Sequence, residues 1–90
     1  MTIQVKISRV HRRFTNDREA VEVNGHTVEE CLKNLVQQFP ALEGRLVDKK
    51  GKPLSFIEIF VNQESAYPDE LAKAVSDGDV IHITLMINGG

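Results

Sequence analysis

The sequence ends in two glycines, Gly89 and Gly90, directly after the most hydrophobic segment of the chain. Glycine raises the conformational freedom of a chain end, so this pair contributes nothing to folding. Residues without a Cβ atom do, however, let an extended backbone pass through a narrow channel in another protein. We therefore take the pair as the leading candidate for chemistry, at the carboxyl end of the chain. The alternative is an incidental loose end.

The remaining residues predict no active site and no catalytic residue. The sequence shows no Ser–His–Asp or Cys–His arrangement and no glycine-rich loop that would cradle a phosphate. Asp77 and Asp79 flank Gly78 in a segment typical of a tight turn, which is turn chemistry and not acid–base chemistry. We therefore expect a partner enzyme to supply any catalysis.

The single cysteine, Cys31, is predicted to be a core residue. It lies in the apolar stripe of an amphipathic helix, and buried thiols are inert, so we do not expect it to carry a persulfide. One thiol and three scattered histidines also lack the spacing of a metal site, so no metal is predicted. The histidines are His11, His26 and His82.

Charge is unevenly distributed along the chain. Residues 1–52 hold ten Lys/Arg and seven Asp/Glu (net +3), whereas residues 53–90 hold one Lys and six Asp/Glu (net −5). An acidic half that carries the glycines predicts a partner with a basic docking rim and argues against nucleic acid there. We interpret the basic cluster "RVHRRF", residues 9–14, as a solvated loop, because aromatic residues are scarce and the chain is acidic overall.

No apolar stretch approaches the eighteen residues of a membrane span. The start of the sequence, "MTIQVKISRV", also lacks the charged and apolar zones of a signal peptide. We therefore expect no membrane association and a cytoplasmic location.

Hydrophobic periodicity predicts two strands and then a helix. Apolar residues alternate over 2–10 and again over 18–24, and Asn16-Asp17 between them predicts a hairpin turn. Apolar residues at helical spacing follow from Val28 to Phe39. Thr27 and Glu30 match a capping box, and Pro40 ends the helix.

Two further strands are predicted at 54–62 and 80–86, with a short strand or turn between them. One sheet face would then pack on the helix through Ile57, Ile59, Val61, Ile81, Ile83 and Leu85. The opposite face would carry Phe60, His82, Thr84 and Met86. With Ile87 and Asn88, these residues form a predicted partner-docking patch. The alternative is that they pack under the irregular segment 63–75.

The predicted fold class is α+β: a mixed sheet of four to five strands with one main helix across it. If the first and last strands are central neighbours, the fold is a β-grasp. We expect residues 1–86 to form this domain and residues 87–90 to form a flexible tail.

At this point the chain resembles the MoaD/ThiS family of ubiquitin-like sulfur carriers. The matching features are the Asp77-Gly78-Asp79 turn, the alternating last strand, the Val61-Asn62 segment and the terminal Gly89-Gly90. Within the family, "SFIEIFVNQE" and "AVSDGDVIHI" are most similar to carriers that supply sulfide for cysteine synthesis. The end "LMINGG" lacks the proline-containing tail usual in molybdopterin-synthase small subunits.

The resemblance implies a mechanism in which the chain is a carrier and not an enzyme. An E1-like adenylating enzyme of the MoeB/ThiF type would use Mg-ATP to join the Gly90 carboxylate to AMP. Sulfur would then displace AMP, and a sulfur-acceptor enzyme would consume the resulting thiocarboxylate. The chain itself would bind no cofactor. One alternative is a ubiquitin-like modifier joined through Gly90 to lysines, and another is a plain interaction domain with incidental glycines.

Overall fold

The computed structural model describes residues 2–67 and 69–85 of the chain. Five strands form one mixed sheet: β1 (Thr2–Lys6), β2 (Ala20–Asn24), β3 (Ile57–Val61), β4 (Glu64–Ser65) and β5 (Val80–Leu85). Their order across the sheet is β2-β1-β5-β3-β4, in which β1 and β5 are parallel and the other pairs antiparallel. The predicted β-grasp arrangement, with the first and last strands as central neighbours, is confirmed.

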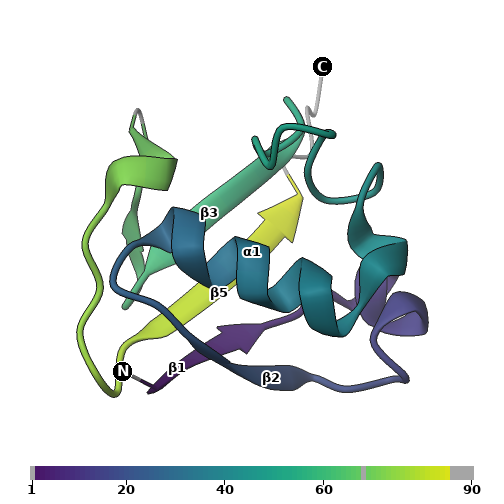
Figure 1. The fold of residues 1–90 in the computed structure, drawn as a ribbon, viewed down its shortest axis with the longest axis horizontal. Coiled ribbons are helices and arrows are strands. Elements are labelled where there is room, and N and C mark those ends of the chain that lie inside the picture. The colour runs from purple at the N-terminus through teal and green to yellow at the C-terminus, as the bar shows by residue number, and fades with distance from the viewer. Residues whose placement is uncertain (1, 68, 86–90) are drawn as a thin grey trace.

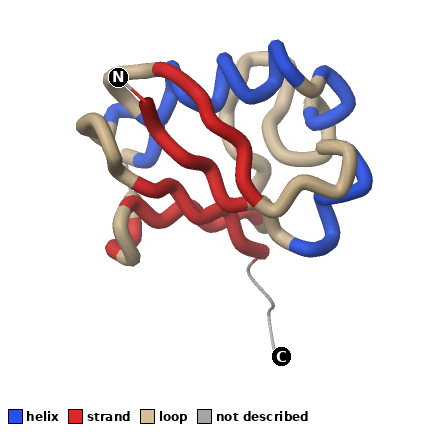
Figure 2. Tube along the Cα trace, turned by 90° about the horizontal axis from the view of Figure 1, so that it is seen from below, coloured by secondary structure: helices blue, strands red, loops and turns tan. Residues whose placement is uncertain are grey.

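Helix α1 (Val28–Gln38) crosses one face of this sheet (Figure 1). Figure 2 shows the same two layers from a second direction. The predicted alternation is confirmed, because the inward positions of β1, β2, β3 and β5 are buried against the helix. The main contributors to this core are Ile3, Val5, Val21, Val23, Leu32, Leu35, Ile57, Ile59, Ile81 and Ile83.

The start of α1 is held by side-chain hydrogen bonds. The Thr27 hydroxyl accepts a hydrogen bond from the Glu30 backbone N–H at 3.2 Å, as a capping box requires. The Glu30 carboxylate reaches one residue further back and accepts from the His26 backbone N–H at 2.8 Å. Gly25 lets β2 pass close to the helix, because a Cβ atom there would lie 2.9 Å from the backbone nitrogen of Cys31.

The first strand is shorter than the sequence predicted. It ends at Lys6 instead of residue 10, and the chain turns into a 3-10 helix, η1 (Arg9–Phe14). The reason is His11, which is buried and accepts a hydrogen bond at Nδ1 from the Ser8 hydroxyl (2.7 Å). Residues 9–14 are therefore not a loop, and His11 is not solvated, although Arg9, Val10 and Arg13 are exposed as predicted. Asn16 and Asp17 do form a turn with positive φ angles of 54° and 62°.

Two short 3-10 helices complete the fold, η2 (Pro40–Leu42) and η3 (Glu70–Ala72). Segment 69–75 lies beside α1, where the Val28 N–H donates to the Lys73 carbonyl at 2.9 Å. Residues 69–75 therefore pack on the helix, and the alternative that the irregular segment covers the opposite sheet face is wrong for them. Residues 64–65 instead pair with β3 at the edge of the sheet. In the described part of the chain, no helix is long and apolar enough to cross a membrane.

Candidate functional site

The strand that leads to the chain's last residues, β5, lies in the middle of the sheet between β1 and β3. Its first residue is fixed by side chains: the Val80 N–H donates to Asn62 Oδ1 (2.9 Å), and Asn62 Nδ2 donates to Asp79 Oδ1 (2.9 Å). Asn62 has a φ angle of 51°, and asparagine is among the few residues that tolerate that conformation. This end of β5 is therefore held firmly.

The Asp77-Gly78-Asp79 segment forms a turn before β5 that its own side chains stabilise, as the sequence predicted. Asp77 Oδ1 accepts from the Thr2 N–H at 2.7 Å, and Asp79 Oδ2 accepts from the Ser76 N–H at 2.8 Å. Gly78 has a φ angle of 89°, which favours glycine. Hydrogen bonds to Asn62 and to the Ser76 N–H hold the pKa of Asp79 below its ordinary value.

Three predicted docking residues, Phe60, His82 and Thr84, lie together on the sheet face opposite α1, which we call the open face. Phe60 pairs with His82 across β3 and β5, and Lys6 of β1 is the partner of His82 on its other side. Phe60, His82 and Thr84 are each half-buried. The predicted grouping of these three residues is thus present in the fold.

His82 is chemically distinctive on this face. Among the described residues, its Nδ1 is the buried side-chain nitrogen or oxygen atom without a hydrogen-bond partner. Because buried polar atoms normally have a hydrogen-bond partner, this nitrogen is the polar atom of the open face that the described residues leave unsatisfied.

The other predicted site residues lie outside the part of the chain that the structure describes. These are Met86, Ile87, Asn88, Gly89 and Gly90. The predicted boundary between a domain at 1–86 and a tail at 87–90 lies there too.

A second feature, beside Leu85 at the end of β5, was missed in the sequence. A hollow of about 360 Å³ opens there between η1, the 44–45 loop and the start of β3. Its lining residues are Val10, His11, Arg13, Phe14, Gly44, Arg45, Phe56 and Leu85. We call it the Leu85 hollow. Val10 (55% exposed) and Phe56 (45% exposed) are two of the large apolar side chains that this chain leaves most open to solvent.

A groove that includes residues of η1 and of the open face adjoins the Leu85 hollow. It is lined in part by His82, Thr84 and Leu85 of β5 and by Lys6, Arg9 and Arg12. Two of its residues, Val10 and Leu85, also line the Leu85 hollow.

The charge near Leu85 differs from the sequence-based prediction. Lys6, Arg9, Arg12, Arg13 and Arg45 line the groove and the Leu85 hollow, against one acidic residue, Glu19. The fold brings the basic first half of the chain to the end of β5. The prediction of an acidic surround with a basic partner rim is therefore wrong for this part of the surface.

Cys31 takes no part in this site. Its side chain is fully buried in the core. Burial, with a smaller contribution from the nearby Glu30 carboxylate, raises the pKa of the thiol to about 11. The prediction of an inert core cysteine is confirmed. In the described ranges, no group of His, Cys, Asp and Glu side chains is arranged to hold a metal ion.

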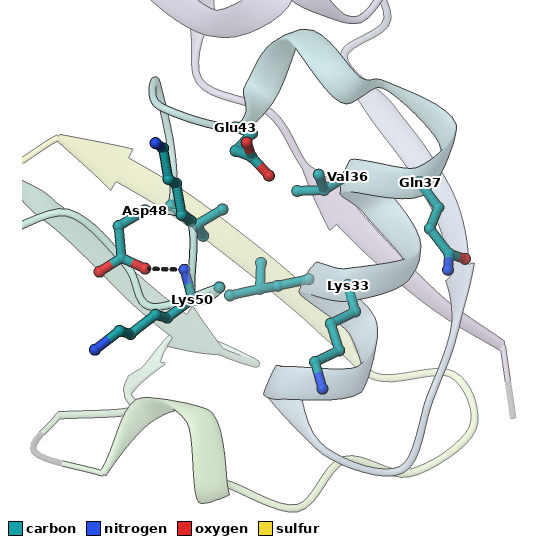
Figure 3. A pocket seen from close by; sticks show the side chains of 10 residues that line it. Lys33, Val36, Gln37, Glu43, Asp48 and Lys50 are labelled. Carbon is teal, nitrogen blue, oxygen red and sulfur yellow. Dashed lines mark hydrogen bonds between the residues drawn. The ribbon is translucent and has the colours of Figure 1, made fainter.

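A further hollow, of about 230 Å³, lies between α1 and the loop at 43–51 (Figure 3). Its lining residues include Leu32 and Val36 of α1, and Lys33 and Lys50 stand at its rim. Asp48 Oδ1 accepts from the Lys50 N–H at 2.8 Å and so fixes the loop. This hollow shares no lining residue with the groove or the Leu85 hollow.

Comparison with solved structures gives proteins of the same fold and length. A chain from the crystal structure of the BexX/CysO complex of Amycolatopsis orientalis is 30% identical, with a TM-score of 0.86; the match covers 98% of this chain and 99% of that one. CysO of Mycobacterium tuberculosis is 28% identical, with a TM-score of 0.84 and coverage of 94% and 99%. SAMP1 of Haloferax volcanii is 26% identical, with a TM-score of 0.84 and full coverage (100%) of both chains.

No curated protein sequence matches this chain significantly. The model of the ThiS family matches residues 5–90, which is nearly the whole sequence and includes both terminal glycines. With the β-grasp fold, this match supports a sulfur-carrier role. The chain belongs to the ThiS family.

Proposed function

We propose that this chain carries sulfur as a thiocarboxylate on Gly90. The observation that carries the proposal is the ThiS family match, which includes Gly89 and Gly90 at the end of the sequence. In the described structure, β5 runs through the centre of the sheet toward these residues.

The chemistry follows from the reactivity of a carboxylate. The Gly90 carboxylate is a poor electrophile until one of its oxygens becomes part of a leaving group. A partner enzyme supplies Mg-ATP, the carboxylate oxygen attacks the α-phosphorus, and pyrophosphate leaves. Hydrosulfide, supplied by a partner protein or a sulfide source, then attacks the acyl carbon, the C–O bond to AMP breaks, AMP leaves, and loss of the thiol proton gives a C-terminal thiocarboxylate. Every catalytic group in these steps belongs to partner proteins.

The favoured acceptor makes cysteine or homocysteine. Support comes from the 30% and 28% identity to chains of structures described as CysO, one of them in a complex with a second protein, BexX. A molybdopterin-synthase role is the next candidate within the same chemistry.

The activating enzyme is of the E1-like MoeB/ThiF type and docks on the open face. Phe60 and His82, which are half-buried neighbours across β3 and β5, offer apolar and aromatic area there. Phe60→Asp places a charge on that face, so we expect it to weaken docking while the fold is retained. Unchanged binding in a titration, with unchanged circular dichroism, would remove this face from the proposal. Met86, Ile87 and Asn88 belong to the same proposed contact.

Intact mass spectrometry tests the carrier function. The chain is incubated with Mg-ATP, a sulfide source and its purified activating enzyme. We expect a mass increase equal to one oxygen replaced by one sulfur, and no increase in a chain that lacks Gly90. Neither a mass change nor AMP formation in the intact chain would refute the proposal.

A protein-modifier role is the second candidate. The observation that favours it is the 26% identity to SAMP1, a structure described elsewhere as a small archaeal modifier protein, over the full length of both chains. Both roles begin with adenylation of Gly90. Conjugates that persist on a denaturing gel, and that disappear without Gly90, would establish the modifier role.

A further inference from the structure

We propose that Arg13 and Arg45, whose guanidinium groups both lie over the ring of Phe14, form a clamp for carboxylates at the edge of the activating enzyme's docking surface. This inference rests on the proposed function, since it identifies where and how that partner is recognised. It adds a charged contact beyond the open face, at the other end of the groove.

The two arginines share one aromatic ring. The Arg13 guanidinium carbon lies 5.4 Å from the centroid of Phe14, and that of Arg45 lies 5.1 Å from it. Both arginines are exposed, whereas Phe14 is half-buried against the core. Stacking on an aromatic face orients a guanidinium while its N–H groups remain free to donate.

The backbone that carries the clamp is also fixed. Buried His11 accepts from the Ser8 hydroxyl at Nδ1, and its Nε2–H donates to the Arg45 carbonyl at 3.2 Å. The imidazole therefore ties η1, which carries Arg13, to the loop that carries Arg45. A clamp whose two charges come from segments thirty residues apart keeps its geometry without a partner.

Neither guanidinium of the clamp is used inside the described chain. The ion pairs found among the described residues are Arg12–Glu19, His26–Glu30 and Lys33–Glu29, and none includes Arg13 or Arg45. Arg12, one residue away, bonds to the Ile7 carbonyl and pairs with Glu19. The contrast is that Arg12 of η1 pairs with a described carboxylate, whereas Arg13 has no ion pair among the described residues.

The chemistry around the clamp favours a protein over a nucleic acid. Val10 and Phe56, both well exposed, line the same hollow as Arg13 and Arg45. Exposed apolar side chains rimmed by arginine are typical of protein interfaces, in which arginine binds carboxylates through two parallel hydrogen bonds. The net charge of the whole chain, −2, works against a polyanion.

Position selects the activating enzyme as the occupant. Leu85 of β5 lines both the Leu85 hollow and the groove that continues to His82 and Thr84. A partner that docks on the open face and works on the carboxyl end can therefore reach the clamp, because the groove and the Leu85 hollow adjoin at Val10 and Leu85. In this proposal an apolar part of the activating enzyme enters the Leu85 hollow, and acidic side chains around it bind Arg13 and Arg45.

The test compares charge reversals with the purified activating enzyme. The concentration of carrier that half-saturates pyrophosphate release is measured for the wild type and for Arg13→Glu/Arg45→Glu. We expect it to rise at least about tenfold at low salt, the lower end of what electrostatic steering provides. The matched control is Lys49→Glu/Lys50→Glu, which makes the same charge change beside the separate hollow of Figure 3 and should leave the value unchanged.

Further variants keep the result interpretable. Arg13→Ala/Arg45→Ala should raise the same concentration less than the reversal and replaces it if the glutamate variant does not fold. Wild-type half-saturation that does not depend on salt, or clamp variants that match the wild type, would overturn the inference. Loss of RNA binding in the clamp variant, with unchanged enzyme binding, would overturn it in favour of a nucleic-acid site. Failure of the wild type to gain sulfur would instead refute the proposed function, which the mass measurement detects separately.

Discussion

The two ends of β5 differ in whether the polar side chains beside them are paired within the described chain. At Val80, Asn62 and Asp79 bond to each other and to the backbone, and little donor or acceptor capacity remains. At Leu85, Arg13 and Arg45 stack on Phe14 without an ion pair to a described carboxylate. Groups that are satisfied internally stabilise the fold, whereas groups left open are available to a partner. Substitutions at the first end should therefore reduce stability, and those at the second end should reduce binding.

Asn62→Ala should give the largest loss of stability. It removes the acceptor for the Val80 N–H and the donor to Asp79, and it places alanine at a positive φ angle. We expect the free energy of unfolding to fall by about 2–4 kcal/mol. Urea unfolding measures the change. Asn24→Ala, an exposed asparagine in β2, is the control and should change it by less than about 0.5 kcal/mol. Equal losses in both variants would contradict the comparison.

His11→Ala should give the next largest effect, at the other end. The substitution empties a buried position and leaves the Arg45 carbonyl without its donor. We expect a loss of about 1–3 kcal/mol, measured in the same way. His26→Ala is the control, because the His26 ring is largely exposed. A loss from His26→Ala as large as that from His11→Ala would show that the buried ring does not hold η1 in place.

Acid should weaken the Val80 end. Hydrogen bonds from Asn62 and the Ser76 N–H hold the pKa of Asp79 below its ordinary value of 3.8. The unfolded chain therefore binds more protons at pH values just below 3.8, and stability falls as the pH drops through that range. Asp79→Asn should reduce this slope in urea unfolding between pH 6 and pH 2. Part of the slope should remain, since the pKa values of Glu30 and Asp48 are also lowered. An unchanged slope in Asp79→Asn would exclude Asp79 as a source of acid sensitivity.

The sequence predicted the Val80 end better than the Leu85 end. The turn around Gly78, the strand faces and the capping residue Thr27 depend on local spacing, and each is found as predicted. The open-face group of Phe60, His82 and Thr84 follows from the same alternation along β3 and β5.

The Leu85 end depends on contacts between distant segments. Apolar residues alternate as far as Val10, so the sequence predicted a strand where the chain in fact turns into η1. The chain turns there because His11 is buried and bonds to the Arg45 carbonyl. The net charges of residues 1–52 and 53–90 predicted an acidic surface around the end of β5, and this prediction was wrong. Parallel pairing of β1 with β5 places the basic segment that follows β1 beside the end of β5. The cluster of three arginines around a histidine was the available signal, but its role requires Arg45 as well.

Arg13→Ala should have the smallest effect on stability, and this makes it the sharpest test of the comparison. Arg12 and Arg13 are neighbours in η1, but Arg12 bonds to the Ile7 carbonyl at 3.2 Å and pairs with Glu19 at 3.7 Å. Among the described residues, the contact given for the Arg13 side chain is the one with Phe14, worth at most about 1 kcal/mol at an exposed site. We therefore expect Arg12→Ala to cost more in urea unfolding than Arg13→Ala, and Arg13→Ala to cost more in binding of the activating enzyme. The reverse order in both measurements would mean that the free arginine serves the fold, and the division between the two ends of β5 would not hold.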